Sequence, residues 1–165
     1  MGPSRFAKTA ERLREGRCPA AGLSFVAEHD GNIVGTVRLW DVCAGPGRPA
    51  VLLGPLAVDE AERCRGIGGA LTRRAIAAAR RSKHRAVLLV GDAGYYQRFG
   101  FSVETTGALW LPGPYERYRL LACELAPGAL DGAHGLVSAT GRTAPAPSLD
   151  ALIAHLDRHQ ARHAA

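Results

Sequence analysis

Glycines and arginines stand together in the stretch Arg63-Cys64-Arg65-Gly66-Ile67-Gly68-Gly69, and these residue types suit the binding of an anion. Glycines at the start of a helix let a phosphate approach the backbone, whose free N–H groups and positive dipole end attract it. Arg63 and Arg65 add charged donors, which bind phosphate more strongly than neutral donors do. The stretch therefore predicts a phosphate-binding loop. The alternative is that its glycines only form a tight turn between a strand and a helix.

The spacing of the glycines excludes two common phosphate-binding loops. No lysine and hydroxyl residue follow Gly69, as G-x-x-x-x-G-K-[ST] requires, and Leu71 stands where the third glycine of G-x-G-x-x-G would fall. The loop instead resembles the acyl-CoA pyrophosphate loop of the GNAT superfamily of N-acetyltransferases, whose pattern is [RQ]-x-x-G-x-[GA]. Arg63, Gly66 and Gly68 match that pattern position for position.

A second motif, Tyr95-Tyr96-Gln97-Arg98-Phe99-Gly100-Phe101, follows a short apolar run. It resembles the [FY]-Y-x-x-x-G-F pattern that ends a short helix after the fifth strand of GNAT enzymes. In that family a tyrosine often lies near the sulfur of coenzyme A, at the position that Tyr96 occupies. With both motifs in family order, the chain from about Leu23 to Leu130 is similar to the small bacterial branch of the superfamily, which uses acetyl-CoA.

The resemblance implies an acetyl-CoA-dependent N-acetyltransferase that passes acetyl directly from the thioester to a primary amine of a small molecule or protein. It implies Tyr96 as the acid that protonates the departing thiolate. The implied cofactor contacts are Leu56, Ala57, Val58, Arg63, Cys64, Arg65, Gly66, Ile67, Gly68 and Gly69. The alternative function is a non-catalytic acyl-CoA-binding or regulatory domain.

This alternative stays open because no side chain is an obvious general base. Keeping a lysine-like amine neutral near pH 7 costs roughly 4–5 kcal/mol, given its ordinary pKa of about 10.4. Asp92 and Glu28 are weak candidates, because a capping or solvated position explains each carboxylate better, and a chain of waters is favoured instead. Cys64 has no accompanying histidine, and the histidines of 155–163 have no further ligands beside them, so we expect neither a cysteine nucleophile nor a metal site.

The elements that must hold these residues follow from apolar patterning. Val51–Val58 predicts a strand whose Gly54-Pro55 pair indicates a bulge, because proline has no N–H for the ladder. The helix that opens at the glycines carries apolar residues at helical spacing, and Ala86–Val90 predicts a buried strand after it. A strand, a helix and a strand in this order predict parallel pairing with a right-handed crossover.

Further elements complete the fold. Residues 6–14 predict a helix, the runs on either side of His29-Asp30-Gly31-Asn32 predict a hairpin, and Tyr118–Leu125 predicts a late strand. The family pattern begins with a strand and a helix for which this chain has no room. The expected fold is therefore an α/β (α+β) GNAT-like mixed, partly splayed sheet flanked by helices, without those two elements and with an extra C-terminal helix.

Changes in residue composition along the sequence divide the chain into three predicted parts. Residues 1–137 form the predicted GNAT-like domain. Residues 138–148 are rich in Pro, Ala, Thr and Gly and predict a flexible linker, and residues 149–165 predict a C-terminal helix with a narrow apolar stripe.

Composition limits the remaining function classes. The chain has 165 residues and a net charge of +6, with arginines gathered around the glycine loop. No aromatic residues alternate with these basic residues, so nucleic acid is not an expected partner. The chain lacks a membrane span, a secretion signal and a C-x-x-C pair, which predicts a cytoplasmic protein with reduced thiols and no membrane partner. A homodimer is compatible with the sequence.

Overall fold

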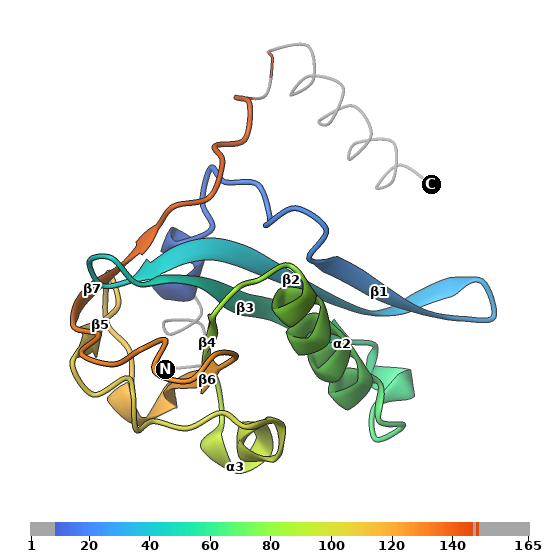
Figure 1. Cartoon of the computed structure of the whole chain (residues 1–165). Helices are drawn as coiled ribbons and strands as arrows, with labels where there is room; N and C mark the ends of the chain where they lie inside the picture. Colours follow the sequence, from blue (N-terminus) through green and yellow to red (C-terminus); the bar gives the residue numbers. More distant parts are fainter. Residues whose placement is uncertain (1–8, 147, 149–165) are drawn as a thin grey trace.

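A curled, mixed β-sheet forms the centre of the structure, a computed structural model that describes residues 9–146 and 148 (Figure 1). The strands are β1 (Ser24–His29), β2 (Asn32–Ala44), β3 (Pro49–Val58), β4 (Ala86–Val90), β5 (Leu109–Trp110), β6 (Leu120–Glu124) and β7 (Gly135–Ala139). The helices are α2 (Ile67–Arg81) and α3 (Ala93–Tyr96), with 3-10 turns η1 (Glu60–Glu62), η2 (Gln97–Phe99) and η3 (Arg117–Arg119). The strand order is β5-β7-β2-β3-β4-β6, with β1 paired to β2, and this mixed arrangement confirms the predicted fold class.

Strands β3 and β4 separate soon after they meet. They pair in parallel only where Val51 lies opposite Val87 and Leu52 opposite Leu88. Beyond this point β3 stays with β2, while β4 pairs with β6. The parallel pairing and the splay predicted from the sequence are therefore both present.

The predicted bulge lies at the point where the strands separate. Gly54 and Pro55 together occupy the place opposite Arg38, since Leu53 pairs with Leu39 and Leu56 with Val37. The buried indole of Trp40 donates its Nε1–H to the carbonyl of Gly54 at 2.6 Å. Because an unsatisfied carbonyl would be costly there, this bond fixes the bulge in place.

Both faces of the sheet are buried, which explains the continuous apolar runs in β3 and β4. On one face Val51, Leu53, Val87 and Leu89 pack in a core with α2, whose Leu71, Ala75, Ala78 and Ala79 point inward. On the other face Leu52 and Leu88 join a second core with Leu13, Trp40 and Leu109. Figure 1 shows α2 lying across the first face. The sheet is therefore a layer between two cores.

The other predicted elements are present with shifted ends. The β1–β2 hairpin, α2 and the turn closed by Gly100 all lie where the sequence places them. Of the predicted N-terminal helix, residues 9–12 are helical and residues 6–8 lie outside the described part. The late strand begins at Leu120 and not at Tyr118, because its partner β4 ends at Val90, which pairs with Leu120. Residues 117–119 form η3 instead.

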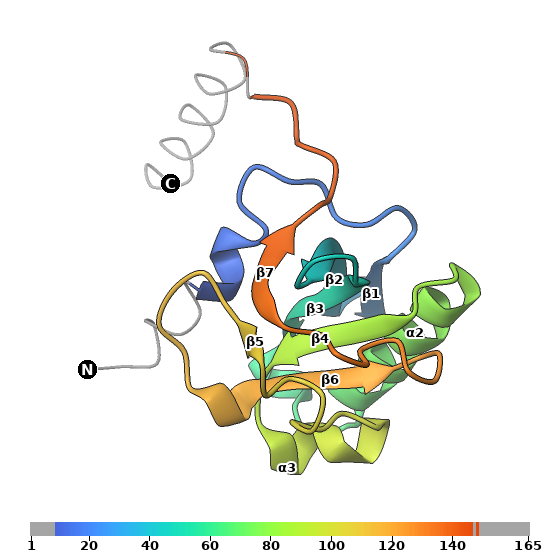
Figure 2. The same ribbon diagram turned by 60° about the vertical axis from the view of Figure 1, so that its left-hand side comes forward.

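The predicted boundary between domain and linker is wrong at its start. Ser138 and Ala139 belong to β7, where they pair with Cys43 and Val42, and Figure 2 shows β7 between β5 and β2. Thr143 then bridges Arg17. The composition of 138–148 does suit a loop, but free backbone groups at the β2 edge recruit its first residues into the sheet. The predicted C-terminal helix, with its histidines, lies outside the described residues.

These contacts predict the effect of two truncations. A chain ending at Val137 loses two ladder pairs and one bridge, each worth about 1 kcal/mol, so its melting temperature should fall by about 5–10 °C. A chain ending at Ser148 keeps all three and should melt within about 2 °C of the full chain if 149–165 is a separate element. Equal melting of the two truncations would show that the pairing of residues beyond Val137 contributes nothing to stability.

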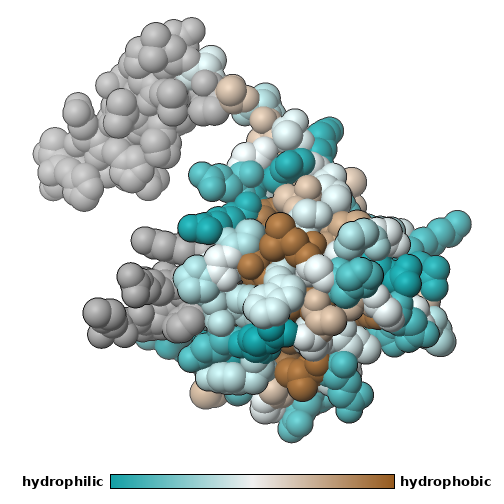
Figure 3. Space-filling view, turned by 90° about the vertical axis from the view of Figure 1, so that its left-hand side faces the viewer, coloured by the Kyte–Doolittle hydropathy of each residue, from teal (hydrophilic) through white to brown (hydrophobic). Residues whose placement is uncertain are grey.

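The β5 edge of the sheet is protected against pairing with other chains. β5 is only two residues long, and the Arg117 guanidinium covers the Trp110 ring at 4.0 Å from its centroid. Figure 3 shows the side of the molecule on which β5 and β7 lie, and this surface is mainly hydrophilic with small separate hydrophobic patches. Short edges and nearby charge are the usual means by which sheets avoid aggregation. The homodimer stays a prediction.

Two sequence expectations concern the chain as a whole. The cysteines at 18, 43, 64 and 123 are all free, as predicted. In the described part of the chain, every helix is too short or too polar to cross a membrane.

Candidate active site

The glycine loop ends in an open helix terminus. Gly66 precedes α2 with φ of 80°, a left-handed conformation that favours glycine. The first bond of the helix runs from the N–H of Ala70 to the carbonyl of Gly66 at 2.9 Å. The N–H groups of Ile67, Gly68 and Gly69 therefore come before the helical ladder and are available to an anion.

These residues line a cavity of about 430 Å³, which we call the loop cavity. Its lining consists of Val58, Glu62, Arg63, Cys64, Gly66, Ile67, Gly68, Gly69, Arg73, Tyr95, Arg98 and Phe99. Seven of the ten residues predicted to contact the cofactor are among them. Arg65 is not, since its Nη1 lies 2.5 Å from the Glu62 carboxylate.

Five residues of the loop cavity were not assigned to it from the sequence: Glu62, Arg73, Tyr95, Arg98 and Phe99. Arg73 follows Gly69 by one helical turn and shares its face of α2, a spacing that could have identified it. Arg98 donates its Nε–H to the carbonyl of Tyr95 at 2.9 Å and stacks on the Tyr95 ring at 4.1 Å. The Tyr95 hydroxyl would lie 3.2 Å from a Cβ placed on Gly68. The cavity thus holds Arg63, Arg73 and Arg98 against a single carboxylate.

The free edge of β3 leads away from the loop cavity. The N–H of Asp59 donates to the carbonyl of Val34 at 2.8 Å, and residues facing β2 alternate along an antiparallel ladder. Ala57 therefore directs its backbone groups to β2, whereas Leu56 and Val58 direct theirs to the edge that β4 has left. The three residues predicted to contact the cofactor along this strand therefore differ in the edge that their backbone groups face.

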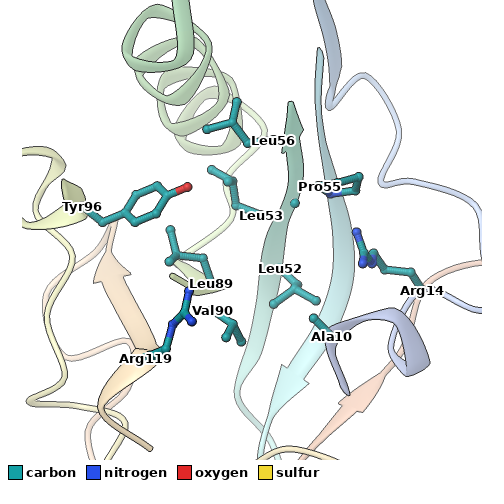
Figure 4. Close-up of a pocket in the computed structure, with 11 residues that line it drawn as sticks. Ala10, Arg14, Leu52, Leu53, Pro55, Leu56, Leu89, Val90, Tyr96 and Arg119 are labelled. Carbon is teal, nitrogen blue, oxygen red and sulfur yellow. The ribbon is translucent and has the colours of Figure 1, made fainter. Parts of the chain in front are cut away.

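A second cavity of about 290 Å³ fills the space between the separating strands, and we call it the splay cavity. Figure 4 shows the residues that line it: Ala10, Arg14, Leu52, Leu53, Gly54, Pro55, Leu56, Leu89, Val90, Tyr96 and Arg119. Leu56 at one cavity and Val58 at the other connect the two sites along a single strand edge. An extended ligand could therefore reach from the glycines to the splay.

Tyr96 is the titratable side chain of the splay cavity that sequence reasoning assigned to catalysis. It ends α3, which begins where the Asp92 carboxylate accepts the N–H of Gly94 at 3.3 Å. Its ring meets Tyr95 edge-on at 4.8 Å and Phe101 at 5.8 Å, and Figure 4 shows its hydroxyl directed into the cavity toward β3. Burial, and secondarily the neighbouring Tyr95, raises the pKa of Tyr96. The hydroxyl is therefore a proton donor across the neutral range.

The candidate bases lie elsewhere. Asp92 caps α3 and Glu28 belongs to β1, and neither lines the splay cavity. Among the described residues that line it, none is an aspartate, glutamate or histidine. Cys64 is exposed at the loop cavity and is also away from the splay. Among the described residues, a carboxylate or histidine base could therefore act in this cavity only through solvent.

Gly91 leaves the space that the Tyr96 ring occupies. A Cβ at Gly91 would lie 2.5 Å from Tyr96 Cε2, so Gly91→Ala should displace the ring and destabilise the fold by about 1–3 kcal/mol. Denaturant unfolding measures this loss. Gly94→Ala is the matched control, since its nearest contact is an ordinary 3.5 Å, and it should change stability by less than about 1 kcal/mol. An equally mild effect of both substitutions would contradict the assigned packing of Tyr96.

Comparison with known proteins identifies similar sequences and structures. The family model described as "Acetyltransferase (GNAT) domain" matches residues 20–103. The N-acetyltransferase YhbS of Escherichia coli K12 is 31% identical over 132 residues, covering 79% of this chain and 78% of that protein. The crystal structure of E. coli YhbS in complex with CoA is similar with a TM-score of 0.66 and 32% identity, over 81% of this chain and 74% of that one. A GNAT acetyltransferase from Brucella melitensis in complex with acetyl-CoA has a TM-score of 0.55 and 27% identity, over 90% and 79% of the two chains.

Proposed function

This chain belongs to the GNAT family of N-acetyltransferases, and on that premise we propose that it transfers acetyl directly from acetyl-CoA to a primary amine. The observation that carries the proposal is that the loop cavity and the splay cavity beside Tyr96 lie along the same strand, β3, whose edge is left free between them. Relatives that hold CoA or acetyl-CoA support the identity of the donor. A metal has no part in the proposed reaction.

The loop cavity is the proposed site of the CoA pyrophosphate. The N–H groups at the start of α2 and the guanidinium groups of Arg63, Arg73 and Arg98 offer donors and positive charge. Arg63 shares its charge with Glu60, which its Nη1 contacts at 2.9 Å, so Arg73 and Arg98 are expected to supply much of the attraction. Helix N-termini and arginine forks are the usual partners of phosphate in proteins.

The free edge of β3 is the proposed track of the pantetheine arm. An amide-containing chain lying there can pair with the backbone groups that Leu56 and Val58 direct away from β2. The thioester then enters the splay cavity, where one of these N–H groups can stabilise the negative charge that develops on the carbonyl oxygen. The bulge at Gly54-Pro55 widens the space beside this part of the strand.

Tyr96 is the proposed general acid. The neutral amine attacks the thioester carbonyl carbon and forms the new C–N bond, and the C–S bond then breaks. The departing CoA sulfur takes a proton from the Tyr96 hydroxyl. The nitrogen gives up its proton to water, and the phenol regains one from solvent, so protons balance over the cycle. Since burial keeps Tyr96 protonated, its hydroxyl is suited to the donor role.

The decisive experiment follows CoA release from acetyl-CoA with a thiol reagent, with and without a panel of primary amines. Amine-dependent release, with acetylated amine found by mass spectrometry, is expected. Tight binding of acetyl-CoA without release for any amine would overturn the proposal in favour of the non-catalytic acyl-CoA-binding domain. The amine-free reaction measures hydrolysis and is the control.

A further inference from the structure

Two arginines line the splay cavity from opposite sides. Figure 4 shows Arg14 on the side of β3 and Arg119 on the opposite side, below Tyr96. Arg14 comes from the segment that follows the helical residues 9–12, and Arg119 ends η3 just before β6. With no acidic side chain among the described lining residues, the cavity carries two positive charges beside the proposed thioester position.

Arg14 lies on an anchored segment, and no described residue forms an ion pair with its guanidinium. Its neighbour Leu13 is buried, and the hydroxyl of Thr9 donates to the carbonyl of Pro114 at 2.5 Å, which anchors the segment. Within residues 9–146 and 148, the Arg14 guanidinium makes no hydrogen bond or ion pair, although it is half-buried. Burial lowers the pKa of Arg14, and Glu11 offsets this only in part. A half-buried guanidinium without a partner gains stability from an anion that binds it.

The Arg119 guanidinium has N–H donors that its contacts with described residues do not use. Its Nε–H reaches the carbonyl of Gly91 only at 3.4 Å, and its Nη1 lies 3.8 Å from the Glu116 carboxylate. A guanidinium has five N–H donors, so most of its hydrogen-bonding capacity remains available to a ligand. The ion pair with Glu116 offsets part of the Arg119 charge and leaves most of its N–H donors available.

Arg14 also lines a second cavity beside the splay cavity. It lines a wider outer cavity of about 670 Å³ together with Glu11, Arg12, Glu15, Arg38, Trp40 and Pro55. Arg14 and Pro55 belong to both cavities, so the outer cavity adjoins the splay cavity at these two residues. An acceptor that enters through the outer cavity passes Arg14 before it reaches the thioester.

We propose that the acceptor is a small amine that carries a carboxylate, and that Arg14, with Arg119, binds this carboxylate. The proposal rests on the acetyltransferase function above and names its substrate class. Guanidinium forks match carboxylate geometry, often with two parallel hydrogen bonds. The same charges disfavour an ammonium nearby, so the bound amine loses its proton more readily, which lessens the need for a base. A cationic amine without an anionic group is repelled.

The test compares matched acceptors. The probes are the ω-amino acids from glycine to 6-aminohexanoate, the carboxamide of each, and a lysine-containing peptide. We expect kcat/KM to be at least about tenfold higher for one or more carboxylates than for its carboxamide, as charge-assisted bonds predict. For glycine, the carboxamide has the less basic amine and would be favoured by intrinsic reactivity, so this preference requires recognition of the carboxylate. Faster acetylation of the carboxamides or the peptide overturns the inference and leaves the acetyltransferase function intact.

Variants assign the recognition to Arg14. Arg14→Gln should lower kcat/KM for the preferred carboxylate about 10–100-fold, mainly through KM, and for its carboxamide less than about threefold. Arg14→Lys should restore part of the loss. Arg81→Gln removes the same charge from an exposed position outside both cavities and should change neither substrate. Equal losses for both acceptors, or a loss of acetyl-CoA affinity, would make Arg14 a structural or donor-site residue and overturn the inference.

A binding measurement separates the two proposals. Calorimetry titrates the preferred ω-amino carboxylate into the CoA-loaded protein and into CoA-loaded Arg14→Gln. Binding that depends on Arg14 without any turnover would support the anionic site and contradict the acetyltransferase function. Turnover of amines without a carboxylate preference, and without Arg14-dependent binding, would support the acetyltransferase function and contradict the anionic site.

Discussion

Replacing Gly68 with glutamate should weaken acetyl-CoA binding by about 100-fold or more while the protein stays folded. A Cβ at this position lies 3.2 Å from the Tyr95 hydroxyl and 3.6 Å from Val58 Cγ2, so a longer side chain must turn into the loop cavity. There it places a negative charge where the pyrophosphate is proposed to bind. Like charges brought together cost several kcal/mol, and each 1.4 kcal/mol is a factor of ten in affinity.

A matched control tests whether position or charge causes this effect. Gly107→Glu adds the same charge at a site where a Cβ meets nothing within 4 Å and which lines neither cavity. Calorimetry with acetyl-CoA should give wild-type affinity for this control, and thermal melts should show that both variants are folded. If Gly68→Glu binds acetyl-CoA as wild type does, the glycine loop is not the pyrophosphate site.

Replacing Tyr96 with phenylalanine should lower kcat by about 100-fold, the low end for general acid catalysis. The ring keeps its edge contacts with Tyr95 and Phe101, so acetyl-CoA affinity should change by less than about threefold. Steady-state kinetics on an accepted amine and a CoA titration of the same variant measure the two quantities. A wild-type kcat would reduce Tyr96 to a packing residue, and a joint loss of kcat and affinity would make it a binding residue.

The pH profile gives an independent test of the same role. An acid must be protonated, and burial raises the pKa of Tyr96 above its ordinary value of about 10. The active form is therefore present through the neutral and mildly basic range and is lost only above about pH 10. Wild-type activity should rise from pH 7 to about 9.5 as the amine loses its proton. A basic limb centred below pH 9 that Tyr96→Phe abolishes would contradict the raised pKa.

Local sequence determined the donor side of the site. The spacing of Gly66 and Gly68 predicts an open helix start, and Gly66 does adopt the left-handed conformation that the turn requires. The Gly54-Pro55 pair predicts the bulge because proline cannot give an N–H to the ladder. Helical spacing of apolar residues predicts α2 with its buried face. Each of these features depends on a few consecutive residues, so it can be predicted without knowledge of distant partners.

The tertiary structure decided which residues meet. Arg73 and Arg98 come from different elements and line one cavity, and Arg14 and Arg119 line another, although nothing in their local sequence links either pair. Backbone groups alternate in direction along the ladder with β2. As a result Leu56 and Val58, and not Ala57, direct their N–H and C=O groups to the free edge of β3.

The ends of the strands also depended on their partners. Ser138 belongs to β7 because Cys43 offers it a free edge, while Tyr118 stays outside β6 because β4 has already ended. Turns, caps and bulges follow from the conformational limits of single residues, and these limits can be read from the residue types in the sequence. Strand pairing and the charge of a cavity are sums over residues far apart in the chain, and only the folded sheet brings those residues together.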